Sequence, residues 1–205
     1  MKKVLYYFAI TLTLACGSYI QSCSGEDFDE PWQGPEFKTR TGRTRSTLEG
    51  PVIFPTTSMI AGSQEILSRM NDSWEQTLAS CTSTKRREYG FYIYYDYMTG
   101  AITGGINYAG QEVSCGANAS LHMGSPTNTS TLCGMFHTHT SLEYCDSTKF
   151  RNTGPTDVDV AAANQKQIPG FLYDYEAPVI HGGDSKNAPK KLYIYGQYSQ
   201  RPPMN

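Results

Sequence analysis

Residues 87–110, REYGFYIYYDYMTGAITGGINYAG, contain two runs rich in Tyr, Phe and Ile on either side of Thr99-Gly100. Aromatic and β-branched residues favour strands, and a glycine turn between two such runs predicts a β-hairpin. Any fold proposed for the chain must therefore place this hairpin in a sheet.

Further strands and helices are predicted on both sides of this hairpin. Ahead of it, Leu67, Met70, Trp74 and Leu78 recur at steps of three and four, which predicts an amphipathic helix within residues 55–80. After it, we predict strands at TLCGMFHTH, GFLYDY and KLYIYGQY and a helix at PTDVDVAAANQKQ, with irregular segments over 114–130 and up to residue 154. This mixture predicts an α/β (mixed α+β) class, in which a mixed β-sheet is flanked by helices in a single domain.

The N-terminal segment has the layout of a bacterial export signal. A Lys pair precedes an apolar run from Val4 to about Ala15, which is shorter than the roughly 20 residues that a membrane span needs. IQSC before Cys23 resembles a lipobox, whereas the rival Cys16 has no aliphatic residue three places before it. We therefore predict a lipoprotein signal peptide over 1–22, with lipidation at Cys23.

The segment after the predicted anchor is polar and acidic. Residues 23–50 lack periodic apolar spacing and are predicted to form a flexible tether, with the folded domain over 51–205. The tract SGEDFDEPWQG resembles sequences that send lipoproteins to the outer cell surface, although a plain solvated linker has the same composition. We therefore predict that the protein is exported and is anchored in the outer membrane as a lipoprotein. The formal net charge of −2 suggests neither nucleic acid nor an anionic membrane surface as a partner.

Four cysteines follow the anchor: Cys81, Cys115, Cys133 and Cys145. In an oxidising compartment an even number predicts two disulfides, with three possible pairings. No C-x-x-C pair occurs, which argues against a zinc ribbon.

The motif His137-Thr138-His139 places two imidazoles on one face of a predicted strand, where they can bind one Zn²⁺. Two ordinary strand histidines would produce the same pattern. The other histidines, His122 and His181, are predicted on surface loops, from which either could reach the site.

Two acids at the start of the predicted helix are candidate third ligands. Asp157 and Asp159 both follow Thr156, and a carboxylate at a helix N-terminus stays ionised. Thr156 and Asp159 also fit a helix cap that needs no metal. Upstream, Glu88 precedes a strand whose Gly90 permits close backbone approach, so Glu88 is either a general base or an exposed charge.

The combination of Glu88, His137-x-His139 and Thr156-x-x-Asp159 resembles the JAMM (MPN+) zinc metallopeptidases, whose pattern is an early Glu, H-x-H and S-x-x-D. The resemblance spans residues 58–197 and implies an MPN-like (deaminase-like) fold with a curved sheet. It implies one Zn²⁺ held by His137, His139 and Asp159, with Glu88 as general base on a metal-activated water and Thr156 in the place of the oxyanion-stabilising Ser.

The chain departs from this family in three places. Thr156 replaces Ser, Thr140 replaces the usual Pro, and sixteen residues separate His139 from Thr156 where about seven are usual. We predict that a Cys133–Cys145 disulfide stiffens this insertion beside the metal. A cysteine nucleophile paired with a histidine is the rival explanation of these cysteines.

Other metal-dependent classes fit less well. A cytidine deaminase needs H-x-E and C-x-x-C, a metallo-β-lactamase needs H-x-H-x-D-H, and an amidohydrolase barrel needs roughly 250 residues. The sequence thus predicts a zinc peptidase or isopeptidase acting on a protein or peptide substrate. The alternative is a non-catalytic surface lipoprotein that uses the same fold for binding or assembly.

Overall fold

The computed structural model describes residues 54–115, 117–177, 179–183 and 186–196. The predicted signal peptide and tether lie outside the described residues, as do the lipidation candidates Cys16 and Cys23. Among the described residues, no helix combines the length and the apolar character that crossing a membrane requires.

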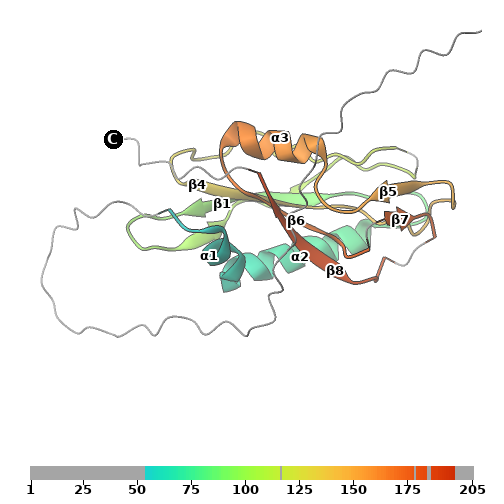
Figure 1. Cartoon of the computed structure of the whole chain (residues 1–205), viewed down its shortest axis with the longest axis horizontal. Helices are drawn as coiled ribbons and strands as arrows, with labels where there is room; N and C mark the ends of the chain where they lie inside the picture. The colour runs from blue at the N-terminus through green and yellow to red at the C-terminus, as the bar shows by residue number, and fades with distance from the viewer. Residues whose placement is uncertain (1–53, 116, 178, 184–185, 197–205) are drawn as a thin grey trace, which may run out of the picture. The chain divides into compact units, whose positions relative to one another are not determined.

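A mixed β-sheet forms the centre of the domain (Figure 1). Its strand order is β2-β1-β4-β6-β8, and β3 also pairs with β1. β4 runs parallel to β6, and the β1–β4 and β6–β8 pairs are antiparallel. The strands are β1 (Tyr89–Tyr95), β2 (Ile102–Gly104), β3 (Tyr108–Ala109), β4 (Leu132–Thr138), β6 (Gly170–Tyr175) and β8 (Lys190–Tyr195). The predicted mixed α+β class and the predicted hairpin are confirmed.

One face of the sheet is covered by α1 (Thr57–Gly62) and α2 (Gln64–Ser80). Ser63 interrupts the single helix predicted here, because its extended backbone ends α1 and begins α2. The buried face of the helix also differs from the predicted one. Ile66 is buried with Met70 and Trp74, whereas Leu67 and Leu78 are only partly buried. These side chains pack on Phe91, Ile93, Phe136 and Phe171.

The opposite face is covered by α3 (Asp157–Lys166), which Figure 1 shows on the side of the sheet away from α2. Its Ala163 packs with Met135 and Leu172 in a second, smaller core cluster. Because helices cover both faces, every residue of the central strand β4 is buried. β4 therefore ends in an interior position, where the chain carries His137 and His139.

A small second sheet pairs β5 (Phe150–Asn152) with β7 (Val179–His181). β5 lies in the stretch that was predicted to be irregular, between the histidines and α3. A strand of three residues among polar neighbours produces no periodic signal in the sequence. Neither β5 nor its pairing with β7 could therefore be predicted.

Gly90 is required where β1 passes β4. A Cβ at this position would lie 2.3 Å from the Phe136 carbonyl oxygen and 2.6 Å from a Leu121 methyl carbon. We expect Gly90→Ala to lower the free energy of unfolding by about 1–3 kcal/mol, because the added methyl overpacks the strand pair. Thermal unfolding should detect the change. Gly62→Ala is the matched control, since no atom lies within 4 Å of its added Cβ, and equal melting temperatures for the two variants would contradict this account.

Candidate metal centre

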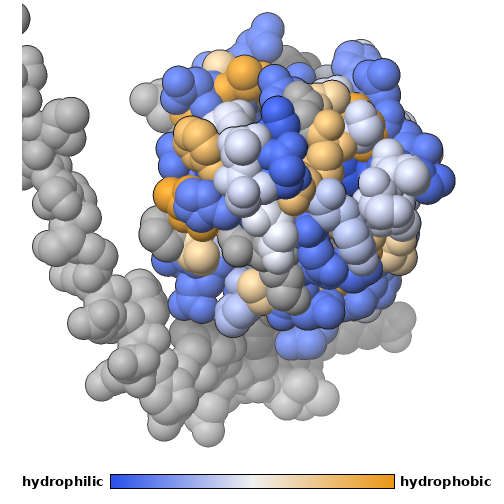
Figure 2. Space-filling view, turned by 90° about the vertical axis from the view of Figure 1, so that its right-hand side faces the viewer, coloured by the Kyte–Doolittle hydropathy of each residue, from blue (hydrophilic) through white to orange (hydrophobic). Residues whose placement is uncertain are grey.

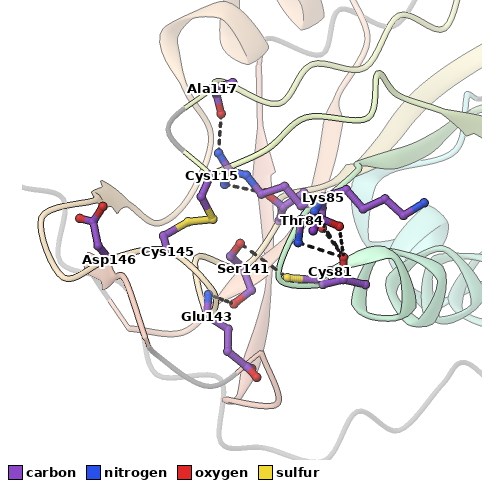
Figure 3. Close-up of a disulfide and its surroundings, with 12 residues drawn as sticks. Cys81, Thr84, Lys85, Cys115, Ala117, Ser141, Glu143, Cys145 and Asp146 are labelled. Carbon is purple, nitrogen blue, oxygen red and sulfur yellow. Dashed lines mark hydrogen bonds between the residues drawn. A yellow bond between two sulfur atoms is a disulfide. The ribbon is translucent and has the colours of Figure 1, made fainter.

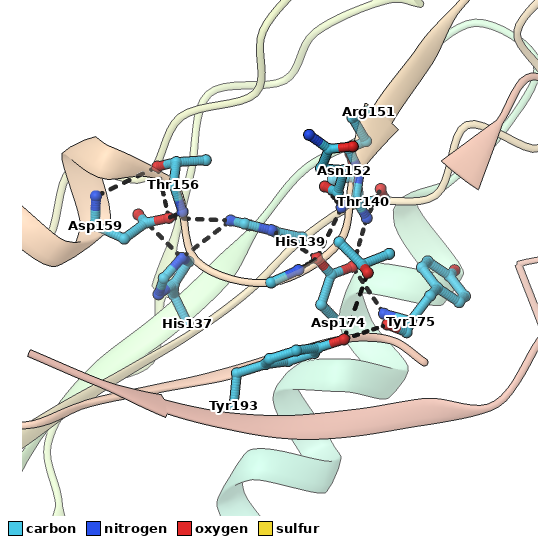
Figure 4. Close-up of polar contacts among 12 residues, drawn as sticks. His137, His139, Thr140, Arg151, Asn152, Thr156, Asp159, Asp174, Tyr175 and Tyr193 are labelled. Atoms are coloured by element: carbon cyan, nitrogen blue, oxygen red, sulfur yellow. Dashed lines mark hydrogen bonds and ion pairs between the residues drawn. The ribbon is translucent and has the colours of Figure 1, made fainter. Parts of the chain in front are cut away.

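His137 and His139 lie side by side at the end of β4 and point into the same site (Figure 4). Their Nε2 atoms are 3.3 Å apart, and both side chains are buried. Thr138, between them, points to the opposite face, where its hydroxyl contacts the Thr77 hydroxyl at 2.5 Å. The predicted same-face arrangement of the two histidines is confirmed.

Asp159 brings a carboxylate from α3 to both imidazoles. Its Oδ1 lies 3.3 Å from His137 Nε2, and its Oδ2 lies 3.4 Å from His139 Nε2. The predicted helix cap is present as well, with the Thr156 hydroxyl accepting from the Asp159 N–H and the Asp159 carboxylate accepting from the Thr156 N–H. Asp157, the rival third ligand, is exposed and is not part of this group.

The distance between the two imidazole nitrogens fits a tetrahedral cation. Bonds of about 2.0–2.1 Å from Zn²⁺ to nitrogen and oxygen place neighbouring ligands about 3.3–3.4 Å apart at tetrahedral angles. The two imidazole nitrogens are 3.3 Å apart, as this geometry requires, and the Asp159 carboxylate faces them with one oxygen each, so that one ligand atom from each of the three residues lies within 4.8 Å of the others. Two imidazoles and one carboxylate are also a common ligand set for zinc. His137, His139 and Asp159 can therefore hold a metal ion.

Asp174 fixes the orientation of His139. This fully buried residue of β6 lies with its Oδ2 3.0 Å from His139 Nδ1, so an N–H at Nδ1 leaves the Nε2 lone pair directed toward Asp159. Arg151 from β5 donates to both oxygens of Asp174 at 2.7 and 2.5 Å, and the Gly154 N–H donates to it at 2.9 Å. β5 thus supports the site through Asp174, as Figure 4 shows.

Tyr195 contacts Nδ1 of His137, as Asp174 contacts Nδ1 of His139. Its hydroxyl lies 3.3 Å from His137 Nδ1, and the tyrosine is buried at the end of β8. Each imidazole therefore has a polar partner on Nδ1 and presents Nε2 to the shared point. Metal-binding histidines usually have such partners on the second nitrogen.

The site stabilises positive charge. Burial by itself lowers the pKa of His139, but hydrogen bonds to Asp159 and Asp174 outweigh it and raise that pKa to about 9. Burial acts to raise the pKa of Asp159, yet the two imidazoles hold it far below its ordinary value. Burial likewise opposes ionisation of Asp174, and His139 and Arg151 overcome it to give a pKa of about 2. The carboxylates of Asp159 and Asp174 are thus ionised near neutral pH. A proton and a metal ion compete for the position between the two imidazoles and Asp159.

Asp174→Asn should weaken zinc binding without removing a ligand. Loss of an outer partner of a metal-binding histidine typically costs about 10–100-fold in metal affinity. Arg151 also loses its carboxylate partner, which should lower the free energy of unfolding by about 1–3 kcal/mol. Competition with a chelating dye measures the first effect and thermal unfolding the second. Asp72→Asn, an exposed acid on α2, is the control, and an unchanged zinc affinity in Asp174→Asn would show that Asp174 has no role at the metal.

Glu88 lies just before β1 and is buried, with 9% of its surface exposed. The interpretation as an exposed charge is therefore wrong. Burial raises the pKa of Glu88, and the nearby His139 and His137 act in the opposite direction. Glu88 lines the same pocket as His137, His139 and Asp159. Two other glutamates, Glu112 and Glu143, do not line this pocket, since Glu112 pairs with Lys85 and Glu143 accepts from the Lys186 backbone N–H.

The pocket has a volume of about 810 Å³. Its lining includes the largely apolar side chains of Tyr92, Leu121, Met123 and Met135. It also includes the polar or cationic side chains of Arg86, Thr140, Lys149 and Arg151. His122 lines this pocket from an exposed loop, whereas His181 lies in β7 with its ring against Phe150.

Thr156 also lines the pocket, but its hydroxyl is engaged. It lies 2.7 Å from Asp159 Oδ2, to which it donates its proton, and it accepts from the Asp159 N–H. In this conformation Thr156 fixes the Asp159 carboxylate and has no proton left for an oxyanion. The role implied by the resemblance to the JAMM family requires its hydroxyl to rotate.

The predicted Cys133–Cys145 disulfide is wrong: Cys145 is bonded to Cys115, as Figure 3 shows. The pairing of Ile93 with Gly134 and of Tyr94 with Leu132 leaves Cys133 as the extra residue of a β-bulge. Cys133 is buried in the main core cluster, and burial raises its thiol pKa to about 12. The disulfide therefore joins the 114–130 loop to the insertion after His139.

The prediction of two disulfides is also wrong, since among the described cysteines only Cys115 and Cys145 are bonded, while Cys81 and Cys133 are free and buried. Burial also raises the pKa of the Cys81 thiol. Neither free thiol lines the pocket of the histidines, which gives the cysteine-nucleophile alternative no support.

The residues that support the two histidines were not predicted from the sequence. Asp174 had a usable signal, because it is an acid inside the otherwise apolar strand GFLYDY. Arg151 and Tyr195 had none, since only the pairing of β5 and β8 with their neighbours brings them to the histidines.

Comparison with known proteins found no family model that matches this sequence and no curated protein with detectable sequence similarity to it.

Proposed function

We propose that this protein is a zinc-dependent hydrolase of peptide or isopeptide bonds, of the JAMM type. The observation that carries the proposal is the convergence of His137, His139 and Asp159, with ligand atoms within 4.8 Å of one another, in the same pocket as the buried carboxylate of Glu88. The order of these residues along the chain and the mixed sheet with helices on both faces are also as expected for an MPN-like fold.

The chemistry is divided among few residues. A bound Zn²⁺ would polarise the scissile carbonyl and lower the pKa of water. Glu88 would take a proton from the attacking water and deliver it to the leaving amine, for which a carboxylate with a raised pKa is suited. Asp174 and Tyr195 keep the imidazoles in their ligating orientation, and Thr156 holds Asp159.

A binding or assembly module is the second candidate, and one observation favours it. The Thr156 hydroxyl donates to Asp159, so the donor expected to stabilise an oxyanion is engaged elsewhere. In that case the metal would serve stability or ligand binding, and no bond would be cleaved.

We further propose that the protein is exported and lipid-anchored at Cys23. The Cys115–Cys145 disulfide supports an oxidising compartment, where such bonds persist. Intact mass after native export tests the anchor, because acylation that survives Cys23→Ser would exclude this residue.

A panel of peptide and isopeptide substrates distinguishes hydrolase from binding module. We expect cleavage of at least one substrate, loss of that cleavage on chelation, and its return on addition of zinc. A fully zinc-loaded protein that cleaves no member of a broad panel would favour the binding module.

A further inference from the structure

Arg86 is a buried cation for which the described residues provide no ion-pair partner. Only 7% of its surface is exposed, and its contacts are neutral, with Nη1 donating to the Thr140 hydroxyl at 3.0 Å and Nη2 donating to the Ala117 carbonyl. Its Nε has no partner among the described residues. Glu88 acts on this charge electrostatically but makes no ion pair with it. A buried charge that no carboxylate contacts is costly, so its presence needs an explanation.

The position of Arg86 supplies an explanation, because this residue lines the same pocket as the two histidines. Thr140, which accepts from Arg86, directly follows the metal ligand His139, and Arg151 Nη2 donates to the Thr140 carbonyl at 3.1 Å. The other anchor, Ala117, is two residues from Cys115 (Figure 3), so the disulfide helps to hold the loop that fixes Arg86. The guanidinium is thus held in place before any substrate arrives.

The charges of the pocket point to an anionic occupant. Four cations line it, namely Arg86, Lys149, Arg151 and Lys166, whereas its carboxylates are Glu88 and Asp159, with Asp174 behind Arg151. A divalent metal would add to this positive excess, although the chain as a whole is formally negative.

The face at the β5–β7 end is mostly hydrophilic, with hydrophobic residues interspersed rather than gathered in one patch (Figure 2).

We propose that Arg86 binds a substrate carboxylate, so that the preferred substrate carries a carboxylate close to the scissile bond. Arginine suits this task because its planar donors match a carboxylate, and hydrogen bonds between charged groups are stronger than neutral ones. The carboxylate is either the C-terminal group of a peptide or an acidic side chain. This inference rests on the proposed zinc site and names the substrate class for it.

Four matched probes test the inference by binding to the zinc-loaded protein. Each is a succinyl monohydroxamate, whose hydroxamate binds zinc, coupled to glycine, glycine amide, aspartic acid α-amide or asparagine amide. The glycine pair tests a terminal carboxylate and the Asp/Asn pair tests a side-chain carboxylate. In the wild-type protein we expect at least one acid to bind about 10–100-fold more tightly than its amide, as for hydrogen bonds between charged groups.

Variants of Arg86 test whether this residue causes the preference for an acid probe over its amide. Arg86→Met should abolish it while zinc content and the affinity for the amide probes stay unchanged, and Arg86→Lys should retain part of it. Arg87→Met is the matched control, because the neighbouring Arg87 pairs with Glu112 and does not line the pocket. If Arg86→Met fails to fold, the wild-type comparison still tests the preference for an acid, and Arg86→Lys still tests whether that preference depends on Arg86.

The outcomes separate the two proposals. Amide probes that bind as tightly as both acids in the wild-type protein, or a preference that survives in Arg86→Met, overturn the carboxylate inference alone. A protein that binds neither zinc nor any of the four probes overturns the proposed function and this inference with it.

Discussion

Glu88→Gln should abolish hydrolysis and leave the metal in place. Glutamine keeps the shape of the side chain but cannot accept a proton from water, so the rate should fall by about 10²–10⁴-fold, as is typical of losing a general base. His137, His139 and Asp159 are untouched, and zinc content and melting temperature should change little. Cleavage kinetics on a responsive substrate, together with metal analysis, measure both parts.

Two results would reassign Glu88. Loss of zinc in Glu88→Gln would make it a ligand or a support of the ligands, and a wild-type rate would make it a bystander. Glu112→Gln is the matched control, because that exposed glutamate pairs with Lys85 and lies outside the pocket. Its rate should equal that of the wild-type protein.

Asp159→Ala should lose zinc, whereas Asp157→Ala should keep it. Removing one of three protein ligands should cost more than the roughly 10–100-fold in affinity associated with an outer partner. Both acids lie in the first turn of α3, so a general effect of negative charge at the helix N-terminus would appear in both variants. Only Asp159 contacts the two imidazoles.

Asp159→Ala also removes half of the capping box, which typically costs about 0.5–2 kcal/mol. Asp159→Asn separates the two effects, since its amide oxygen can still accept from the Thr156 N–H while the charge is lost. Full zinc retention in both Asp159 variants, or equal zinc loss in Asp157→Ala, would be incompatible with the ligand set.

Local sequence signals predicted the parts of the site that lie on single elements. His137 and His139 share a face because side chains alternate along β4, and Thr156 and Asp159 meet because a helix cap brings the first and fourth residues together. The prediction of Gly90 as a point of close approach also holds. Each of these depends on residues within a few positions of one another.

Contacts between distant segments were not predictable in the same way. Arg151 reaches Asp174 only because β5 pairs with β7, and Cys115 meets Cys145 only because two long loops adjoin. The bulge that places Cys133 in the core depends on the register of β1 against β4. A sequence pattern records the periodicity of one element, whereas these features depend on how elements are paired.

The zinc content of the purified protein tests the central claim most directly. After gentle purification and dialysis against metal-free buffer, metal analysis should find about one zinc ion per chain in the wild-type protein, as expected of one site with three protein ligands. His139→Ala, analysed in parallel, should contain almost none. Less than about half an equivalent in the wild-type protein, or full zinc in His139→Ala, would contradict the account.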